Sequence, residues 1–202
     1  MGKKFRLGVL ASGGGSNFEA IVKRSLEGYI KSKVVVLIVN NKDAYAIERA
    51  KKYNIPYHYI SSKTEGSHEK AMEKITKVLK DYNVDLVILA GYMKKILPPL
   101  LTEYKNRILN IHPALLPKYG GKGYYGLNVH KKVLENNEKE TGPTVHLVDE
   151  IYDHGKILGQ YKLNIIPGLT PEELQQRVLE LEHLLYSRVI KDIEEGYIIL
   201  DE

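Results

Sequence analysis

The sequence contains no cysteine, no tryptophan and only two phenylalanines among its 202 residues. Without cysteine the chain has no disulfide scaffold, no cysteine metal site and no thiol chemistry. Its apolar runs all fall well short of the roughly 20 residues that span a bilayer, and its first residues carry no export signal. We therefore expect a cytoplasmic protein without a membrane partner.

The chain also lacks a large excess of charge of one sign. It has 30 basic and 25 acidic side chains, which give a net charge of +5. The lysines are scattered, and no basic stripe alternates with aromatic side chains that could stack on bases. This charge suits small anionic ligands at least as well as nucleic acid, so we expect no nucleic-acid partner. The contents of hydrophobic residues (43%) and charged residues (27%) are typical of a globular protein.

Apolar runs typical of buried strands alternate with amphipathic helical patterns along the first half of the chain. Strands are expected over residues 5–11, 33–39, 55–60, 84–90 and 107–111. Helices are expected over residues 18–26, 44–53, 68–82 and 93–104, with a polar loop over 61–67. This alternation predicts an α/β fold, with a mostly parallel twisted sheet and helices on both of its faces.

The second half of the chain has a different pattern. It predicts a short helix over 129–136 and then two strands, 142–148 and 157–165, which pair antiparallel across an acidic loop. Thr170 and Pro171 open a final helix that runs to about residue 195. We expect a single domain over residues 1–202, with a Rossmann-like, nucleotide-binding half to about residue 105 and a mixed antiparallel half from about residue 106.

A glycine-rich turn, Ser12-Gly13-Gly14-Gly15-Ser16-Asn17, joins the first expected strand to the first expected helix. This arrangement aims backbone N–H groups and the positive end of the helix at one place, where a phosphate can bind. The turn matches neither the dinucleotide fingerprint nor the P-loop, since the further glycines and the lysine of those motifs are missing. From the turn alone, tight packing explains the glycines as well as phosphate binding does.

Asn110 and His112 lie two residues apart at the end of the strand expected over 107–111, so both project from one face of it. They precede a loop at the carboxyl edge of the sheet, where open α/β proteins usually bind their ligands. An amide that donates and an imidazole that titrates near neutral pH suit acid–base chemistry. Taken alone, however, Asn-x-His-Pro is explained equally well by a hydrogen-bonded polar strand end.

Asp153, in the acidic loop, is the natural partner of His112, because a nearby carboxylate would raise the pKa of His112 and hold its tautomer. The alternative is an aspartate that caps its own turn before Gly155. His146 alternates into an expected strand, which favours a buried core histidine. No pair of histidines has the helical spacing of a zinc motif, so we expect no metal.

Five stretches, taken together, resemble the folate-dependent formyltransferases over nearly the whole chain. They are the turn 12–17, Leu89-Ala90-Gly91-Tyr92-Met93, Leu109-Asn110-Ile111-His112-Pro113-Ala114-Leu115-Leu116-Pro117, Gly142-Pro143-Thr144-Val145-His146 and Asp153-His154-Gly155. The order of the motifs, with Glu182-His183 in the last helix, is similar to that of the members from purine biosynthesis. The resemblance implies that a formyl group moves from 10-formyltetrahydrofolate to the amine of 5-phosphoribosylglycinamide through a tetrahedral intermediate.

The resemblance also implies roles for single residues and makes the half from about residue 106 the catalytic and folate-binding one. Asn110, His112 and Asp153 match the catalytic trio, without a metal. The residues that match the phosphoribosylglycinamide site are Gly15, Ser16, Asn17, Pro113 and Glu182. The residues that match the folate pocket are His68, Met93, Lys94, Lys95, Ile96, Val148 and Asp149. A homodimer is compatible with this reading.

Two features depart from the family pattern. The loop over residues 118–126 is longer than in many members, and His68 stands where many members carry an arginine. Two alternatives use the same scaffold: a formyltetrahydrofolate hydrolase, or a folate-binding module without catalysis. A module that only binds folate does not need the trio of Asn110, His112 and Asp153.

Overall fold

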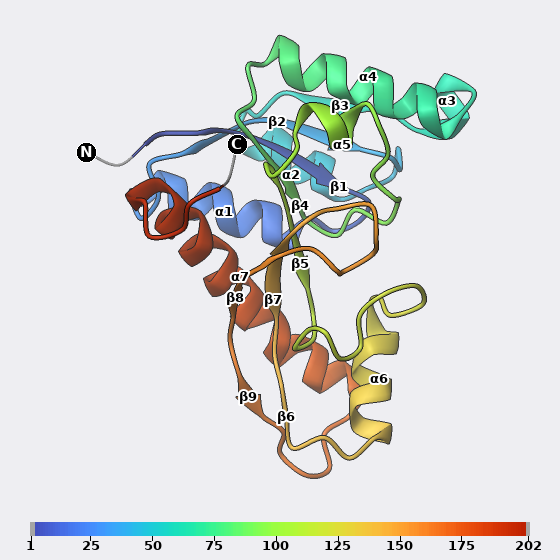
Figure 1. Ribbon diagram of the computed structural model, residues 1–202, viewed down its shortest axis with the longest axis vertical. Coiled ribbons are helices and arrows are strands. Elements are labelled where there is room, and N and C mark those ends of the chain that lie inside the picture. Colours follow the sequence, from blue (N-terminus) through green and yellow to red (C-terminus); the bar gives the residue numbers. More distant parts are fainter. Residues whose placement is uncertain (1–2, 201–202) are drawn as a thin grey trace.

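The computed structural model describes residues 3–200 and is built around a seven-stranded sheet (Figure 1). The strands stand in the order β3-β2-β1-β4-β5-β7-β8, and the first five in that order are parallel, whereas β7 and β8 are antiparallel to their neighbours. Their bounds are β1 (Arg6–Ala11), β2 (Lys33–Val39), β3 (Tyr57–Tyr59), β4 (Leu86–Leu89), β5 (Ile108–His112), β7 (Thr144–Leu147) and β8 (Ile157–Gln160). The predicted fold class, a mostly parallel sheet with a mixed antiparallel part, is confirmed.

Helices cover both faces of this sheet, as the sequence pattern predicts. They are α1 (Ser16–Leu26), α2 (Ala46–Lys52), α3 (Ser62–Glu65), α4 (His68–Asp81), α5 (Leu100–Glu103), α6 (Leu127–Glu135) and α7 (Pro171–Glu195). Alternate side chains of β1 enter two separate cores, because Leu7 and Val9 pack in the core that contains α1 and α7, and Leu10 packs in the core that contains α4. Figure 1 shows α4 and α7 on opposite sides of the sheet.

The longest helix, α7, has ends that the sequence itself encodes. Thr170 caps its first turn, where the Thr170 hydroxyl accepts from the Glu173 N–H and the Glu173 carboxylate accepts from the Thr170 N–H. Gly196 ends it in the left-handed conformation, with φ of 81°. The helix passes from α1 to α6 along the sheet and so holds the two halves of the chain together.

The predicted helix over residues 93–104 is wrong for most of its length. Only α5 (Leu100–Glu103) is helical, and residues 93–99 form turns and loop. Pro98 and Pro99 explain the difference, because neither has an N–H for a helical hydrogen bond and each disfavours helix in the residue before it. The freed segment runs past the carboxyl end of β4, which places it beside the site described below.

Two other expectations need correction. The polar loop predicted over residues 61–67 contains the single turn α3, which a capping box between Ser61 and Thr64 stabilises. The single strand predicted over residues 157–165 is broken after β8, and its remainder forms β9 (Leu163–Asn164), which pairs with β6 (Glu140–Thr141) in a second small sheet. At the break, the chain passes so close to Gly142 that a Cβ there would lie 1.9 Å from the Tyr161 carbonyl oxygen.

Within the described range of 3–200, no helix combines the length and the apolar character needed to cross a membrane. The prediction that the chain lacks an export signal concerns its first residues, of which Met1 and Gly2 lie outside the described residues.

Candidate active site

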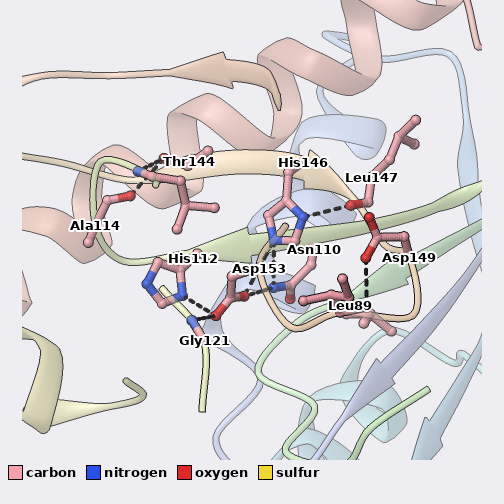
Figure 2. A network of polar contacts seen from close by, with 12 residues as sticks. Leu89, Asn110, His112, Ala114, Gly121, Thr144, His146, Leu147, Asp149 and Asp153 are labelled. Carbon is pink, nitrogen blue, oxygen red and sulfur yellow. Dashed lines mark hydrogen bonds and ion pairs between the residues drawn. The ribbon is translucent and has the colours of Figure 1, made fainter. Parts of the chain in front are cut away.

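The carboxyl end of β5 and the loop between β7 and β8 bring three predicted side chains together (Figure 2). Asn110 and His112 lie on one face of β5, as their spacing predicts, and both point toward Asp153 from the loop. The Asn110 Nδ2 atom is 3.4 Å from Asp153 Oδ1, and the His112 Nδ1 atom is 3.4 Å from Asp153 Oδ2. The juxtaposition that the sequence predicts is therefore present, whereas the catalytic role of the trio stays a prediction.

Asp153 is largely buried and does not cap its own turn. Its backbone has a left-handed φ of 53°, and its Oδ2 atom accepts a hydrogen bond from the Gly121 N–H at 2.9 Å. Burial alone raises the pKa of Asp153, but His146, His112 and the Gly121 N–H together hold this pKa below its ordinary value. The carboxylate is therefore ionised near neutral pH and faces the two imidazoles.

His112 differs from expectation in the sign of its pKa shift. Its side chain is 4% exposed, and burial lowers its pKa below the ordinary value by more than the neighbouring Asp153 raises it. The Nε2 atom lies 2.6 Å from the Tyr119 carbonyl oxygen, so this nitrogen carries a hydrogen and donates it. Asp153 does raise this pKa, as expected, but the net shift is downward, because removal of the imidazolium from water outweighs the attraction.

His146 belongs to the same cluster, although its position in a strand favours a simple core histidine. It is buried, with its Nε2 atom 3.1 Å from Asn110 Nδ2 and 3.5 Å from Asp153 Oδ1. In the antiparallel register of β5 and β7, His146 stands directly opposite Asn110. Only that register reveals the contact, since 36 residues separate the two side chains along the chain.

Two other histidines lie near the trio. His130, on α6, is buried, and burial together with His112 lowers its pKa to about 4. His154 contacts Asp149 at 2.8 Å on the exposed side of the loop. Among residues 3–200, no group of three or more histidine, aspartate or glutamate side chains is arranged to hold a metal ion.

The glycine-rich turn lies at the same edge of the sheet, between β1 and α1. Gly15 has φ of 71°, and a Cβ on it would lie 2.7 Å from the Ala46 Cβ, so tight packing does account for this glycine. Ser16 begins α1, whose first N–H groups point out of the edge. Asn17 is buried, and its Oδ1 atom has no hydrogen-bond partner. The turn therefore combines close packing with unused polar groups.

Glu182 connects this turn to α7. Its Oε2 atom accepts a hydrogen bond of 2.7 Å from Asn17 Nδ2, and burial raises its pKa to about 7. The sequence leaves open whether Glu182 enters a pocket or faces water, and the structure answers that it turns inward. Pro113 follows directly after His112 and is half-buried at the same edge.

A pocket next to the trio is lined by most of the predicted folate residues: Lys94, Lys95, Ile96, Val148 and Asp149. The same pocket is lined by Asn110, His146 and Asp153, so it opens onto the catalytic candidates. It is also lined by Tyr92, Ile151 and Tyr152.

Two predicted folate residues do not line that pocket. His68 lies at the start of α4, and its Nε2 atom is 2.7 Å from the Lys95 carbonyl oxygen, so it braces the segment that carries Lys95. Met93 has an exposed side chain, while its N–H donates to the Ser12 hydroxyl at 2.8 Å. The Met93 contact ties the pocket segment to the glycine-rich turn.

An α/β sheet with a titratable cluster at its carboxyl edge is shared by many enzymes, and comparison with known proteins narrows the class. The family model "Formyl transferase" matches residues 5–190. The chain belongs to this family.

The names of individual relatives identify a narrower class of enzyme than the family model does. A chloroplastic phosphoribosylglycinamide formyltransferase of Arabidopsis thaliana is 46% identical over 93% of this chain and 65% of its own length. The protein with that enzyme name from Haemophilus influenzae is 38% identical over 98% of this chain and 91% of its own. The crystal structure of glycinamide ribonucleotide transformylase 1 from Symbiobacterium toebii superposes with a TM-score of 0.92, at 37% identity, over 98% of this chain and 91% of that one.

The chain spans less than two thirds of two plant relatives, covering 65% of the Arabidopsis protein and 63% of the one from Vigna unguiculata.

Proposed function

We propose that this chain transfers the formyl group of 10-formyltetrahydrofolate to the amine of 5-phosphoribosylglycinamide, a step of purine biosynthesis. The observation that carries the proposal is the contact of Asp153 with both Asn110 and His112 at the mouth of a pocket. The names of the relatives support the choice of both substrates. The trio favours catalysis over the folate-binding module, because binding alone does not require an ionised carboxylate beside two imidazoles.

The proposed reaction begins when the amine nitrogen attacks the formyl carbon and the formyl oxygen becomes an oxyanion. The Asn110 amide and an N–H of His112 are the donors that stabilise this charge. The C–N bond to the folate then breaks, and a proton passes from the attacking amine to the departing folate nitrogen, with Asp153 and His112 as the relay. The His112 Nε2–H is held by Tyr119 in the free chain, so the substrates compete with that bond.

We infer that Gly15, Ser16 and Asn17 bind the phosphate of phosphoribosylglycinamide at the start of α1. The left-handed Gly15 and the free first N–H groups of this 11-residue helix support the inference. The Asn17 Oδ1 atom, which has no hydrogen-bond partner, can accept a hydrogen bond from a hydroxyl or amide group of the substrate. Glu182 is then placed to accept from the ribose hydroxyls, and Pro113 borders the amine.

We infer that the folate occupies the pocket beside the trio. Ile96 and Val148 provide apolar walls, and Lys94, Lys95 and Asp149 provide the polar rim. Met93 and His68 support the wall from outside the pocket through their contacts with Ser12 and Lys95. A second copy of the chain and a cytoplasmic compartment stay predictions, which sedimentation and cell fractionation test.

The decisive experiment measures formyl transfer from 10-formyltetrahydrofolate, with and without phosphoribosylglycinamide, for the wild type and for His112→Ala. We expect turnover that requires the amine and is lost in the variant. Release of formate without the amine would instead indicate a hydrolase. Folate binding without any turnover would indicate the binding module.

A further inference from the structure

The orientation of the Asn110 amide follows from the hydrogens of His146. The His146 Nδ1 atom lies 2.7 Å from the Leu147 carbonyl oxygen. A carbonyl oxygen only accepts, so Nδ1 carries the hydrogen. In the neutral ring the other nitrogen, Nε2, then has a free lone pair and is an acceptor. The nearest amide atom, Asn110 Nδ2 at 3.1 Å, meets that acceptor with its NH₂ group.

Asp153 disfavours the flipped amide. Its Oδ1 atom is 3.4 Å from Asn110 Nδ2, and an ionised carboxylate has only acceptor oxygens. If the amide turned over, the Asn110 oxygen would face both the Nε2 lone pair and the carboxylate, with no hydrogen in either contact. With neutral His146, both Asn110 contacts contain a hydrogen only when Asn110 donates one hydrogen to His146 and the other toward Asp153.

The two hydrogens of the Asn110 amide are not held equally. The contact with His146 is 3.1 Å, and the contact with Asp153 is 3.4 Å, so the second hydrogen is the more easily redirected. That hydrogen can turn to the oxygen of the formyl group, whereas a flipped amide would offer its own oxygen to a developing negative charge.

We propose that His146 is a positioning residue, which holds the Asn110 amide so that its NH₂ end, and not its oxygen, faces the reacting group. The kinetic consequence rests on the proposed formyl transfer, but the structural claim does not. His146 itself does not touch the reacting atoms and acts through Asn110.

The structural claim is tested by nitrogen NMR of the ¹⁵N-labelled chain without ligands at neutral pH. We expect a protonated Nδ1 and an unprotonated Nε2 in His146, with a coupling across the hydrogen bond from Asn110 Nδ2 to Nε2. A hydrogen on Nε2 at this pH would overturn the proposal. This measurement is independent of turnover, so it decides the proposal even if the chain proves not to be a formyltransferase.

The kinetic claim is tested with His146→Leu, which removes the acceptor, and with His146→Gln, whose side-chain oxygen can replace it. We expect His146→Leu to lower kcat by up to about 100-fold, the order of one lost oxyanion donor, with KM for phosphoribosylglycinamide nearly unchanged. His146→Gln should recover much of that loss. The control is His58→Leu, which removes a histidine bonded to Tyr82 at the far edge of the sheet, and it should keep the wild-type kcat.

A double-mutant cycle separates positioning from general destabilisation. In the background Asn110→Ala there is no amide to orient, so His146→Leu should cause little further loss of kcat. A full, independent loss in that background would overturn the proposal, since His146 would then act by another route. Thermal unfolding of each variant shows that the compared proteins are folded.

Discussion

At the scale of single residues, the site is governed by burial as much as by charge. Asp153 keeps its charge because His146, His112 and the Gly121 N–H surround it, whereas His112 loses basicity because burial outweighs the attraction of Asp153. Burial raises the pKa of Glu182 to about 7, and the hydrogen bond from Asn17 offsets only part of this effect. The pKa values of all three groups are shifted from those of their types in water, which is common at functional sites.

The variant Asp153→Asn tests the relay. The amide removes the negative charge that faces His112 but preserves the shape of the side chain, so we expect the fold to persist. We expect kcat to fall by about 10²- to 10⁴-fold, the usual contribution of acid–base catalysis. Steady-state kinetics and circular dichroism make the test. The exposed control Asp81→Asn, which breaks an ion pair with Lys77 on α4, should keep wild-type turnover; a fully active Asp153→Asn would remove Asp153 from the mechanism.

The raised pKa of Glu182 predicts how the stability of the fold changes with pH. Its pKa is near 7 in the folded chain and near the ordinary 4.5 when unfolded, so the folded state binds the extra proton between these values. Stability contributed by this group therefore decreases as pH rises through that window. We expect the Tm of the wild type to fall more between pH 5 and 8 than that of Glu182→Gln. Thermal unfolding across pH measures the difference, and Glu180→Gln, at an exposed neighbour, should follow the wild type.

At the scale of elements, α7 connects the parts of the site. Glu182 joins it to the start of α1, and one turn later the fully buried Tyr186 reaches the sheet. The Tyr186 hydroxyl lies 2.9 Å from the carbonyl oxygens of both Leu89, at the end of β4, and Leu109, next to Asn110. Through Tyr186, the helix thus bridges the strand that leads to the pocket and the strand that carries Asn110 and His112.

The variant Tyr186→Phe should weaken this connection without emptying the core. It removes only the hydroxyl, whose single hydrogen the two buried carbonyls share, and we expect the free energy of unfolding to fall by about 1–3 kcal/mol. Urea unfolding measures the change. The matched control is Thr76→Val, whose hydroxyl bonds to the Met72 carbonyl within α4; it should cost much less, because that carbonyl keeps its helical hydrogen bond. Equal losses would show that the hydroxyl of Tyr186 does not connect the strands.

At the scale of the whole molecule, the two predicted halves share one hydrophobic core and one sheet. Leu109 and Val145 from the second half pack in one core with Leu7 and Ile88 from the first, and α7 packs on α1, α6, β7 and β8. Within this one sheet, β5 pairs parallel with β4 and antiparallel with β7, so it links the two kinds of pairing.

This shared core predicts one cooperative unfolding transition. We expect hydrogen exchange, measured by mass spectrometry across a urea series, to show β1 and α7 losing protection at the same midpoint. Two separated midpoints would contradict the single domain over residues 1–202 and would support two independent halves.

The sequence by itself determined the features that depend on neighbours along the chain. Alternation and helical periodicity located nearly all strands and helices, Thr170 marked the start of α7, and the spacing of Asn110 and His112 placed both on one face of β5. Local errors arose where a distant contact or a proline intervened, as at Pro98-Pro99 and at the close approach of Gly142 to Tyr161.

Only the tertiary structure decided which side chains and backbone groups of the site contact one another. The register of β5 against β7 brought His146 to Asn110, the turn after Pro117 brought the Tyr119 carbonyl to His112, and α7 brought Glu182 to Asn17. The sign of the pKa shift at His112 likewise could not be predicted from the sequence, because desolvation depends on every group that packs around the side chain. Pairing register and burial depend on residues far apart in the chain, and no local pattern records them.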